Sequence, residues 1–235
     1  ALRLRRLGAR KVAVTGSLKF DVTAPTAQLK AGQAWRQNWG ATRPVLLAAS
    51  TREGEEAAIL AAFAAGAPAD VLLVLVPRHP QRCANVASLI HAAGLSYVRR
   101  SQLTSEPLGA GVRVILGDSL GELFAYYAAC DVAFVGGSLL PLGGQNLIEA
   151  ASVGCPVLIG PHTFNFAEAA ALAVEMGAAR RVKDAEELMK VAMNLLGDGA
   201  TRQAMGDAGQ AFAARHRGAT ARLVGLIEPL IGSAR

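Results

Sequence analysis

The sequence has 235 residues, of which 52% are hydrophobic and 18% are charged, and its formal net charge is +6. This composition excludes an intrinsically disordered chain, and the length suits one α/β domain, alone or with a fragment of a neighbouring domain. Aromatic residues make up only 5%, so the interleaved basic and aromatic side chains of a nucleic-acid-binding surface are not indicated, and we expect no nucleic-acid partner.

The positive charge is concentrated at the amino-terminal end. Of the 24 Lys and Arg residues, five occur in the first eleven positions without an acidic residue, and the other 19 are nearly balanced by 18 acidic residues. A basic start is attracted to anionic lipid, although a solvated helix face has the same composition. The longest apolar run inside a predicted element, residues 71–76, is far shorter than the ~20 residues that span a bilayer, and no apolar segment of a signal peptide follows the basic start.

The three cysteines, Cys83, Cys130 and Cys155, are too few and too widely spaced for a disulfide framework or a zinc site. This sparse, odd count is typical of a reducing compartment. We expect all three to be buried thiols that pack as small hydrophobic side chains. The sequence has no initiator Met, and we expect it to be a piece of a longer protein.

Residues 1–26 are expected to be the end of a preceding domain and a linker. They comprise the end of a helix that stops at Gly8, a short strand at residues 11–15 and a turn-like segment at residues 16–21, and Pro25 introduces the next element. Residues 27–235 are expected to form a second domain that ends in helices.

Buried apolar runs alternate with helical patterns over this second domain. The alternation predicts an α/β fold, a Rossmann-like, doubly wound parallel sheet with right-handed crossovers. Ligands of such sheets bind at the carboxyl ends of the strands. The predicted strands are residues 44–49, 71–76, 96–98, 112–116, 132–135, 156–159 and 179–182. The predicted helices are residues 27–39 and 53–65, two segments ending at 93 and 129, and residues 146–152, 166–176, 185–196, 201–215 and 219–230.

Residues 130–165 have the layout of a nucleotide site. A buried strand is followed by two glycine pairs, the second being Gly143 and Gly144, then by a short helix and another strand. Glycines let backbone N–H groups approach an anion, and the helix N-terminus behind them is partially positive. Asn146 and Glu149 are three residues apart, so both side chains are expected on one helix face. A carboxylate beside a nucleotide accepts hydrogen bonds from the ribose hydroxyls, although neighbouring loops could equally satisfy both side chains.

Three other predicted strands also end in polar loops. Ser50 and Thr51 precede a helix whose first turn holds Glu53, Glu55 and Glu56. This pattern is typical of a helix cap, and it also suits a pair of hydroxyl groups that face a phosphate, with Arg52 adding charge.

The loop after the second strand has the sequence Pro-Arg-His-Pro. The two prolines rigidify it and leave Arg78 and His79 exposed, and the planar guanidinium of an arginine binds a phosphate or carboxylate with two hydrogen bonds. In the loop at residues 117–122, Gly121 can bring backbone close to a base or phosphate, although a helix cap formed by Asp118 or Ser119 explains the same residues.

The sequence lacks the patterns of several other catalytic and cofactor-binding sites. No Ser/His/Asp constellation, metal-ligand cluster or Walker A sequence occurs, and the glycines of residues 136–144 do not fit G-x-G-x-x-G. We therefore expect neither a nicotinamide nor a flavin cofactor, and no metal ion.

In combination, these motifs resemble the carboxyl-terminal half of the Kdo (3-deoxy-D-manno-octulosonic acid) transferases, which move Kdo from CMP-Kdo to a lipid A precursor. The similarity runs in order over residues 15–166. It is carried by TGSLKFD at 15–21, AASTREGEE at 48–56, PRHPQR at 77–82, GDSLGEL at 117–123, FVGGSLLPLGGQNLIEA at 134–150 and GPHTFNF at 160–166.

The resemblance implies a two-domain GT-B glycosyltransferase fold, with the donor bound by the carboxyl-terminal domain. The chain departs from the family pattern at Ser17, Arg52, Gln145 and Ala150, where the family usually has asparagine, histidine, histidine and proline, so its donor preference is open. It keeps the residues expected to contact the donor, which are Lys19, Ser50, Thr51, Arg78, His79, Ser119, Gly121, Glu122, Gly143, Gly144, Asn146 and Glu149.

The resemblance also implies an inverting attack by an acceptor hydroxyl on the anomeric carbon of Kdo, with CMP as the leaving group. Ser50, Thr51 and the turn at Gly143 and Gly144 would face the CMP phosphate. Arg78 would serve the phosphate or the Kdo carboxylate, and Glu149 the ribose. The backbone of residues 119–121 would serve the cytosine.

The family's catalytic carboxylate and acceptor site belong to the amino-terminal domain, so this chain is expected to bind a donor without completing a turnover. The full-length family acts at the cytoplasmic face of the bacterial inner membrane. Two other interpretations remain open: a GT-B transferase or epimerase that uses a UDP-sugar, and a non-catalytic α/β nucleotide-binding module of flavodoxin or receiver type. The receiver type is the weaker, because no strand end carries clustered aspartates.

Overall fold

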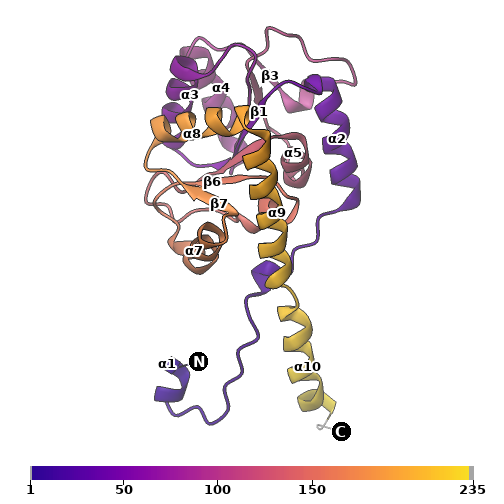
Figure 1. Ribbon diagram of the computed structural model, residues 1–235, viewed down its shortest axis with the longest axis vertical. Coiled ribbons are helices and arrows are strands. Elements are labelled where there is room, and N and C mark those ends of the chain that lie inside the picture. The colour runs from indigo at the N-terminus through magenta and orange to yellow at the C-terminus, as the bar shows by residue number, and fades with distance from the viewer. Residues whose placement is uncertain (1, 233–235) are drawn as a thin grey trace.

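The computed structural model describes residues 2–232. Its described part contains one parallel sheet of seven strands in the order β3-β4-β2-β1-β5-β6-β7, with helices on both faces (Figure 1). The predicted doubly wound sheet is therefore confirmed. The strands are β1 (Val45–Thr51), β2 (Leu72–Pro77), β3 (Tyr97–Arg99), β4 (Val114–Leu116), β5 (Val132–Val135), β6 (Val157–Ile159) and β7 (Ala179–Arg181).

The helices agree with the predicted segments to within a few residues. They are α1 (Leu2–Arg6), α2 (Thr26–Gly40), α3 (Glu55–Gly66), α4 (Cys83–Ala92), α5 (Leu123–Ala129), α6 (Ile148–Ser152), α7 (Ala167–Glu175), α8 (Ala185–Gly197), α9 (Gly199–Arg215) and α10 (Ala219–Gly232). Local sequence explains several of their starts. Asp184 accepts a hydrogen bond from the Glu187 amide at the start of α8, and Asp198 accepts one from the Thr201 amide at the start of α9.

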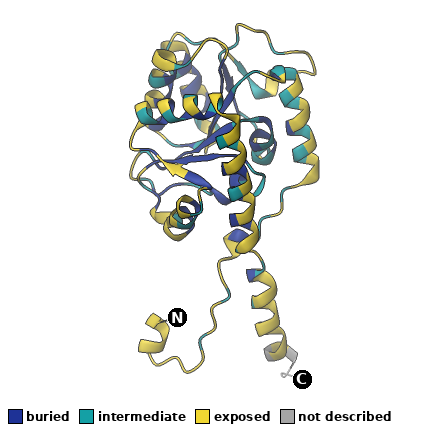
Figure 2. Cartoon of the chain, in the orientation of Figure 1, coloured by how far each residue is buried: buried dark blue, intermediate teal, exposed yellow. Residues whose placement is uncertain are grey.

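The strands form the core because both of their faces are covered. The strands β2 and β5, on either side of β1, are buried along their whole length (Figure 2). Their successive side chains belong to two different hydrophobic clusters, one on each face of the sheet. This explains why these strands are continuous apolar runs in the sequence and do not alternate with polar residues.

The strand order places a topological switch point at the centre of the sheet. From β1 the sheet grows to one side through β2, β4 and β3, and to the other through β5, β6 and β7. The loops after β1 and β5 therefore leave in opposite directions at the carboxyl edge. In open α/β sheets this switch point is where ligands bind.

The predicted strand at residues 11–15 is wrong. The structure has no regular element there, and the residues are exposed or half-buried. They lie in an extended arm that leads from α1 toward the domain (Figure 1). A β-strand needs a partner for its backbone N–H and C=O groups, and within residues 2–232 no strand lies beside this segment.

The arm joins the domain at a 3₁₀ turn, Leu18–Phe20. Phe20 is buried and packs edge-on against Phe212 of α9, with ring centroids 5.4 Å apart. Asp21 accepts hydrogen bonds from the amides of Gly218 and Thr220 at the start of α10, and these bonds, with the Thr220 hydroxyl foremost, lower the pKa of Asp21 to about 2. The turn at the end of the arm is thereby fastened to α9 and to the start of α10.

The cysteines agree with the expectation except for Cys130. Cys83 and Cys155 are buried, whereas Cys130 is half-buried, and all three are free thiols. Among the helices of residues 2–232, none has the length and apolar character that a membrane span requires.

Candidate functional site

Three carboxyl-edge loops meet at the centre of the sheet. The Arg78 amide donates to the carbonyl oxygen of Thr51 over 2.9 Å, which ties the loop after β2 to the end of β1. The Arg78 side chain then donates through Nε to Oε1 of Gln145 over 3.3 Å, which ties it to the loop after β5. Arg78 is exposed and Gln145 is half-buried, so polar groups of both face outward at the switch point.

Ser50 has a strained backbone at this junction. Its φ of 55° makes it the one non-glycine residue of the described chain in the left-handed region. The register between β1 and β2 shifts between Ala49 and Thr51, so the strain coincides with an irregularity at the strand end. Non-glycine residues in this conformation cost about 1–3 kcal/mol and cluster at binding sites. The role of Ser50 at a ligand stays a prediction.

The Thr51 side chain is used inside the protein. Its side chain is buried, and its hydroxyl donates to Oε1 of Glu56 over 3.1 Å. Glu56 is fully buried as well and forms an ion pair of 2.5 Å with Arg82. The prediction that the Thr51 hydroxyl faces a donor phosphate is therefore not supported, because this hydroxyl points into the protein.

Glu55 occupies the anion site of the first glycine turn. Its carboxylate is fully buried and accepts hydrogen bonds from the amides of Gly137, Ser138 and Leu139, at 2.6–2.9 Å, and from the amide of Arg52 at 2.9 Å. The sequence pattern predicted a helix cap for this residue and not its role in the turn. The signal in the sequence that could have indicated this role was a pair of acids, Glu55 and Glu56, at the start of a helix that follows a buried strand.

The second glycine turn, at Gly143 and Gly144, is buried. The Gly144 amide donates to the carbonyl oxygen of Gly137 over 2.6 Å, so this N–H group is used within the loop and does not point at an external phosphate. Gly143 has a φ of 92°, and a Cβ there would meet the side chains of Asn165 and Phe164. Only glycine allows this close packing of the loops after β5 and β6. The turn shapes the site, and a phosphate contact of the turn, which stays a prediction, would need a group other than the Gly144 N–H.

Asn146 and Glu149 lie together, although the helix starts later than predicted. Because α6 begins at Ile148, Asn146 is in the turn before it, and its Oδ1 accepts a hydrogen bond from the Ile148 amide. Its Nδ2 donates to Oε1 of Glu149 over 3.0 Å. Burial raises the pKa of Glu149, while the Asn146 hydrogen bond and the charge of Arg78 lower it. A half-buried carboxylate of this kind needs hydrogen-bond donors.

Ser119, Gly121 and Glu122 form a separate group in the loop after β4. Glu122 accepts hydrogen bonds from the Ser119 hydroxyl and from Nη2 of Arg100, the latter over 3.1 Å. The Arg100 guanidinium lies 4.1 Å from the ring centre of Trp35. Gly121 is exposed, and a Cβ there would meet open space, so its backbone is accessible to a ligand.

Lys19 and His79 lie at the margins of the site. The ammonium group of Lys19 donates to the carbonyl oxygen of Asn165 over 3.2 Å and lies 4.1 Å from the ring centre of Phe166. The amide of Asn165 donates in turn to the Gly143 carbonyl, so Lys19 reaches the second glycine turn through one residue. His79 is exposed and precedes the 3₁₀ turn Pro80–Arg82.

The four positions that depart from the family pattern have different surroundings. Gln145 contacts Arg78, and Arg52 donates its amide to Glu55. The Ser17 hydroxyl accepts from the Lys19 amide and caps the 3₁₀ turn. Ala150 is fully buried in α6. Of these four, only Gln145 is part of the polar cluster at the switch point.

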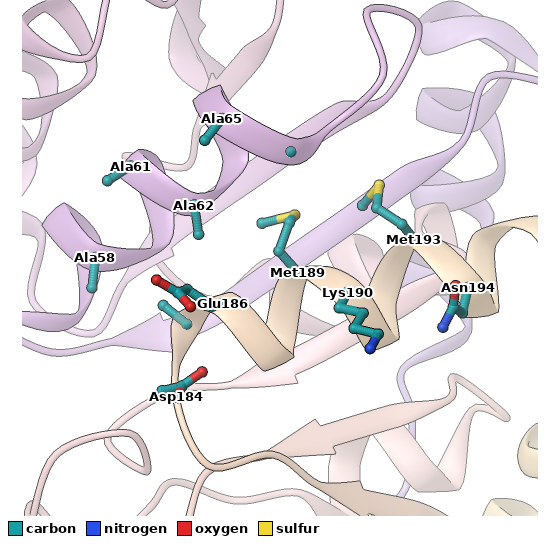
Figure 3. A pocket seen from close by; sticks show the side chains of 12 residues that line it. Ala58, Ala61, Ala62, Ala65, Asp184, Glu186, Met189, Lys190, Met193 and Asn194 are labelled. Carbon is teal, nitrogen blue, oxygen red and sulfur yellow. The ribbon is translucent and has the colours of Figure 1, made fainter.

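A groove of 910 Å³ lies elsewhere, between α3 and α8 (Figure 3). The small side chains of Ala58, Ala61, Ala62 and Ala65 form one wall, and Met189 and Met193 line the other. The site residues predicted from sequence are not among those that line it. In the part of the chain that the structure describes, no group of three or more His, Cys, Asp or Glu residues could hold a metal ion.

Known proteins resemble this chain over nearly its whole length. The 3-deoxy-D-manno-octulosonic acid transferase of Bordetella pertussis is 51% identical over 236 residues, a match that covers 98% of this chain and 54% of the relative. The enzyme of the same name from Haemophilus influenzae is 38% identical over 225 residues, 94% of this chain and 52% of the relative. The chain thus spans about half the length of the curated relatives it matches. No protein-family model matches it.

Solved structures give the same assignment. The C-terminal CMP-Kdo binding domain of WaaA from Acinetobacter baumannii is 31% identical with a TM-score of 0.74, and the match covers 80% of this chain and 98% of that domain. Anabaena HepE, in complex with UDP and glucose, has a TM-score of 0.63 at 19% identity, over 100% of this chain and 60% of that protein, which is a likeness of fold alone. The chain therefore belongs to the Kdo transferase family and corresponds to its carboxyl-terminal, Rossmann-like domain of the GT-B fold.

Proposed function

We propose that this chain is the donor-binding half of a glycosyltransferase that moves Kdo from CMP-Kdo to a lipid A precursor. The observation that carries the proposal is the cluster of Arg78, Gln145, Asn146 and Glu149 beside the strained Ser50, at the switch point of the sheet. The WaaA domain that binds CMP-Kdo and the two curated transferases support this choice of substrate.

The roles of the cluster follow from its chemistry. Glu149 is the acceptor for the ribose hydroxyls, because it is a half-buried carboxylate with only one side-chain donor, Asn146, bonded to it in the described structure. Arg78 is exposed beside it and provides positive charge for the phosphate or the Kdo carboxylate. The exposed backbone at Gly121 contacts the cytosine.

In the proposed reaction an acceptor hydroxyl displaces CMP from the anomeric carbon with inversion. Negative charge grows on the CMP phosphate as the bond breaks, and a fixed positive charge at Arg78 stabilises it without reorganisation. The general base and the acceptor site belong to the amino-terminal domain of the family. We therefore propose that residues 27–235 are the donor domain, that residues 1–26 are the end of its partner, and that this chain alone binds the donor without turnover.

Calorimetric titration with CMP tests this function. We expect CMP to bind more tightly than UMP, UDP or a UDP-sugar. Tighter binding of a UDP-sugar would favour the alternative transferase or epimerase, and binding of none of these nucleotides would favour a module without this donor site.

We also propose that donor binding needs no metal ion, and that the exposed Arg78 supplies positive charge to the phosphate in its place. The expected result is the same CMP affinity in EDTA as in excess Mg²⁺. An affinity that appears only with Mg²⁺ would refute this part of the proposal without affecting the nucleotide assignment.

A membrane partner is proposed for the amino-terminal arm. Leu2, Leu4 and Leu7 are exposed among the arginines of α1 and the turn after it, so apolar and basic side chains are offered together. Such a segment binds anionic lipid, and we propose that the full-length protein acts at the cytoplasmic face of the inner membrane. Co-sedimentation with anionic vesicles should be lost when residues 1–11 are removed, whereas zwitterionic vesicles should bind neither form.

A further inference from the structure

The buried carboxylate of Glu55 is bonded to a distant segment of the chain. Gly137 donates to its Oε2 over 2.6 Å, and Ser138 and Leu139 each donate to its Oε1 over 2.9 Å. These three donors lie 82 to 84 residues away in the sequence. Successive backbone N–H groups that converge on one point form a concave anion site, which in other proteins holds phosphate. In this chain a side chain fills that site.

A helix cap does not account for this arrangement. Asp184 and Asp198, which do cap α8 and α9, accept hydrogen bonds from amides three residues further along their own helices. Glu55 is the first residue of α3 and not its N-cap residue, and its one local donor, the Arg52 amide, precedes the helix. Its remaining bonds leave the helix entirely. The carboxylate therefore fastens α3 to the loop after β5.

The fastened segment holds the polar cluster in place. The carbonyl of Gly137 accepts from the Gly144 amide, and the carbonyl of Gly136 accepts from the Gln145 amide over 3.1 Å. The loop thus closes on itself directly before Asn146.

The same segment also holds the loop after β6. The Ser138 hydroxyl accepts from the Gly160 amide over 2.8 Å, and the Ser138 carbonyl accepts from the His162 amide over 2.9 Å. Each of these bonds depends on the position of Gly137 and Ser138, which Glu55 sets.

We propose that Glu55 is a positioning residue of the donor site. It acts as a built-in anion that fixes residues 137–139 and so presents Gln145, Asn146 and Glu149 in the geometry that binds the nucleotide. The proposal rests on the proposed function for the identity of the ligand, CMP. The fixing of the loop itself does not depend on that identity.

The test compares neutral variants of Glu55 with a packing variant on the same helix. Glu55→Gln keeps the size of the side chain but turns an N–H₂ group toward N–H donors, and Glu55→Ala removes the acceptor. Leu60→Ala is the matched control, because Leu60 is a buried residue of α3 whose truncation destabilises the fold and removes no side-chain hydrogen bond to the loop. CMP affinity and amide hydrogen exchange at Gly144, Gln145 and Gly160 are measured for each folded variant.

We expect Glu55→Gln to weaken CMP binding by about tenfold or more and to accelerate exchange at all three amides, as loss of charged hydrogen bonds dictates. Leu60→Ala should stay within about twofold of the wild-type affinity. In Glu55→Ala, acetate should restore affinity and protection by entering the vacant site, whereas chloride at equal ionic strength should not.

Unchanged affinity and unchanged exchange in Glu55→Gln would overturn the proposal, as would an equal loss of affinity in Leu60→Ala. If the wild type fails to bind CMP, the proposed function falls, and the exchange rates still decide whether Glu55 fixes the loop. If neither neutral variant folds, Glu55→Asp decides: its shorter carboxylate should weaken CMP binding by about threefold and speed exchange. Wild-type CMP affinity and wild-type exchange rates in Glu55→Asp would refute the positioning role of Glu55.

Discussion

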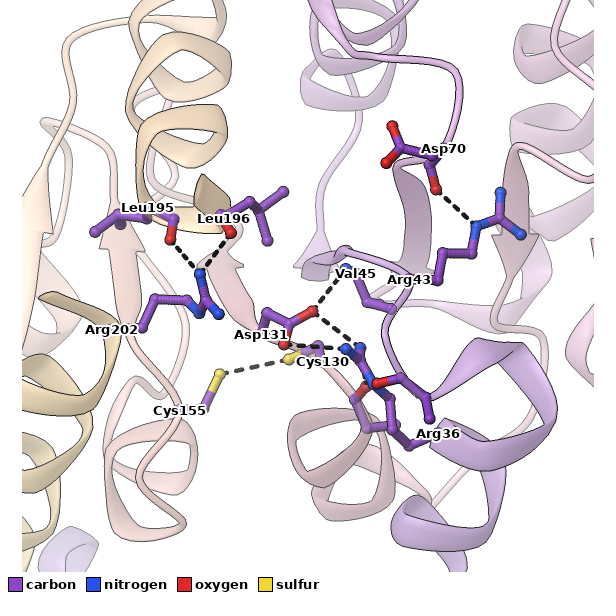
Figure 4. Close-up of polar contacts among 12 residues, drawn as sticks. Arg36, Arg43, Val45, Asp70, Cys130, Asp131, Cys155, Leu195, Leu196 and Arg202 are labelled. Carbon is purple, nitrogen blue, oxygen red and sulfur yellow. Dashed lines mark hydrogen bonds and ion pairs between the residues drawn. The ribbon is translucent and has the colours of Figure 1, made fainter. Parts of the chain in front are cut away.

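The two edges of the sheet differ in the polar side chains that they leave exposed or half-buried. At the amino edge, before β1, β2 and β5, charged side chains bond to backbone groups and to each other (Figure 4). At the carboxyl edge, after β1, β2 and β5, the exposed Arg78 and the half-buried Gln145 and Glu149 face the switch point. The contrast separates polar groups that hold the fold from polar groups that are available to a ligand.

Asp131 shows the structural use at the amino edge. It pairs with both terminal nitrogens of Arg36, the shorter distance being 2.9 Å, and accepts from the Val45 amide over 2.8 Å. Arg43 donates to the carbonyl of Asp70 in the same way over 2.8 Å. Such contacts satisfy strand ends that would otherwise carry unpaired backbone groups.

The two thiols at this edge contact each other. Sγ of Cys130 lies 3.4 Å from Sγ of Cys155 (Figure 4), and burial, together with the hydrogen bond between the two thiols, raises the pKa of the Cys130 thiol. A protonated thiol is a poor nucleophile and a poor metal ligand. The amino edge therefore offers packing and few reactive groups.

The largest predicted effect is at the amino edge. Asp131→Ala leaves Arg36 without its carboxylate and Val45 without its acceptor, so the free energy of unfolding should fall by about 2–3 kcal/mol, discounted for partial exposure. Urea denaturation measures this loss. CMP affinity of the folded fraction should be unchanged, and a parallel loss of affinity would contradict the separation of the two edges.

Glu149→Ala should weaken CMP binding without destabilising the fold, the reverse of Asp131→Ala. Removing the carboxylate that accepts the ribose hydroxyls should weaken CMP binding by about 1–3 kcal/mol, because charged hydrogen bonds are lost. Calorimetry measures the affinity and urea denaturation the stability, which should not fall. Glu186→Ala, an exposed acid in the first turn of α8, is the control and should change neither. Wild-type affinity in Glu149→Ala would remove Glu149 from the site.

Ser50→Gly should stabilise the fold and weaken CMP binding. Glycine adopts the left-handed conformation without a Cβ clash, so the release of strain should stabilise the fold by up to about 1 kcal/mol. CMP should bind more weakly because the hydroxyl is gone. Thermal unfolding and calorimetry check the two effects. A variant that is less stable than the wild type would show that the Ser50 backbone is not strained.

The smallest effect is a dependence on pH. Burial raises the pKa of Glu149 above its ordinary value of 4.5, so the folded state binds this proton more tightly than the unfolded chain does. The free energy of unfolding should therefore decrease as the pH rises from 4.5 through the raised pKa, and the penalty is complete above it. Glu149→Gln should remove this slope and gain less than about 1 kcal/mol at neutral pH. If the curves of unfolding free energy against pH ran parallel for Glu149→Gln and the wild type, they would contradict this prediction.

Sequence alone determined the elements and the edge that carries the site. Apolar runs such as residues 71–76 are long enough to be strands and too short to span a membrane, and parallel strands place their following loops on one edge. The Arg78, Asn146 and Glu149 loops were predicted there, and the structure brings them together. Which nucleotide they hold came from the resemblance and not from these patterns.

The tertiary structure decided what each polar group faces. Glu55 and the Gly137 amide are 82 residues apart, so no local pattern could show that a side chain fills the first glycine turn. The same holds for Thr51, whose hydroxyl turns inward to Glu56, and for residues 11–15, which form no strand because no strand of the described chain pairs with them. Local sequence fixes periodicity and burial, whereas hydrogen-bond partners depend on which distant segments the fold places within 3 Å of each other.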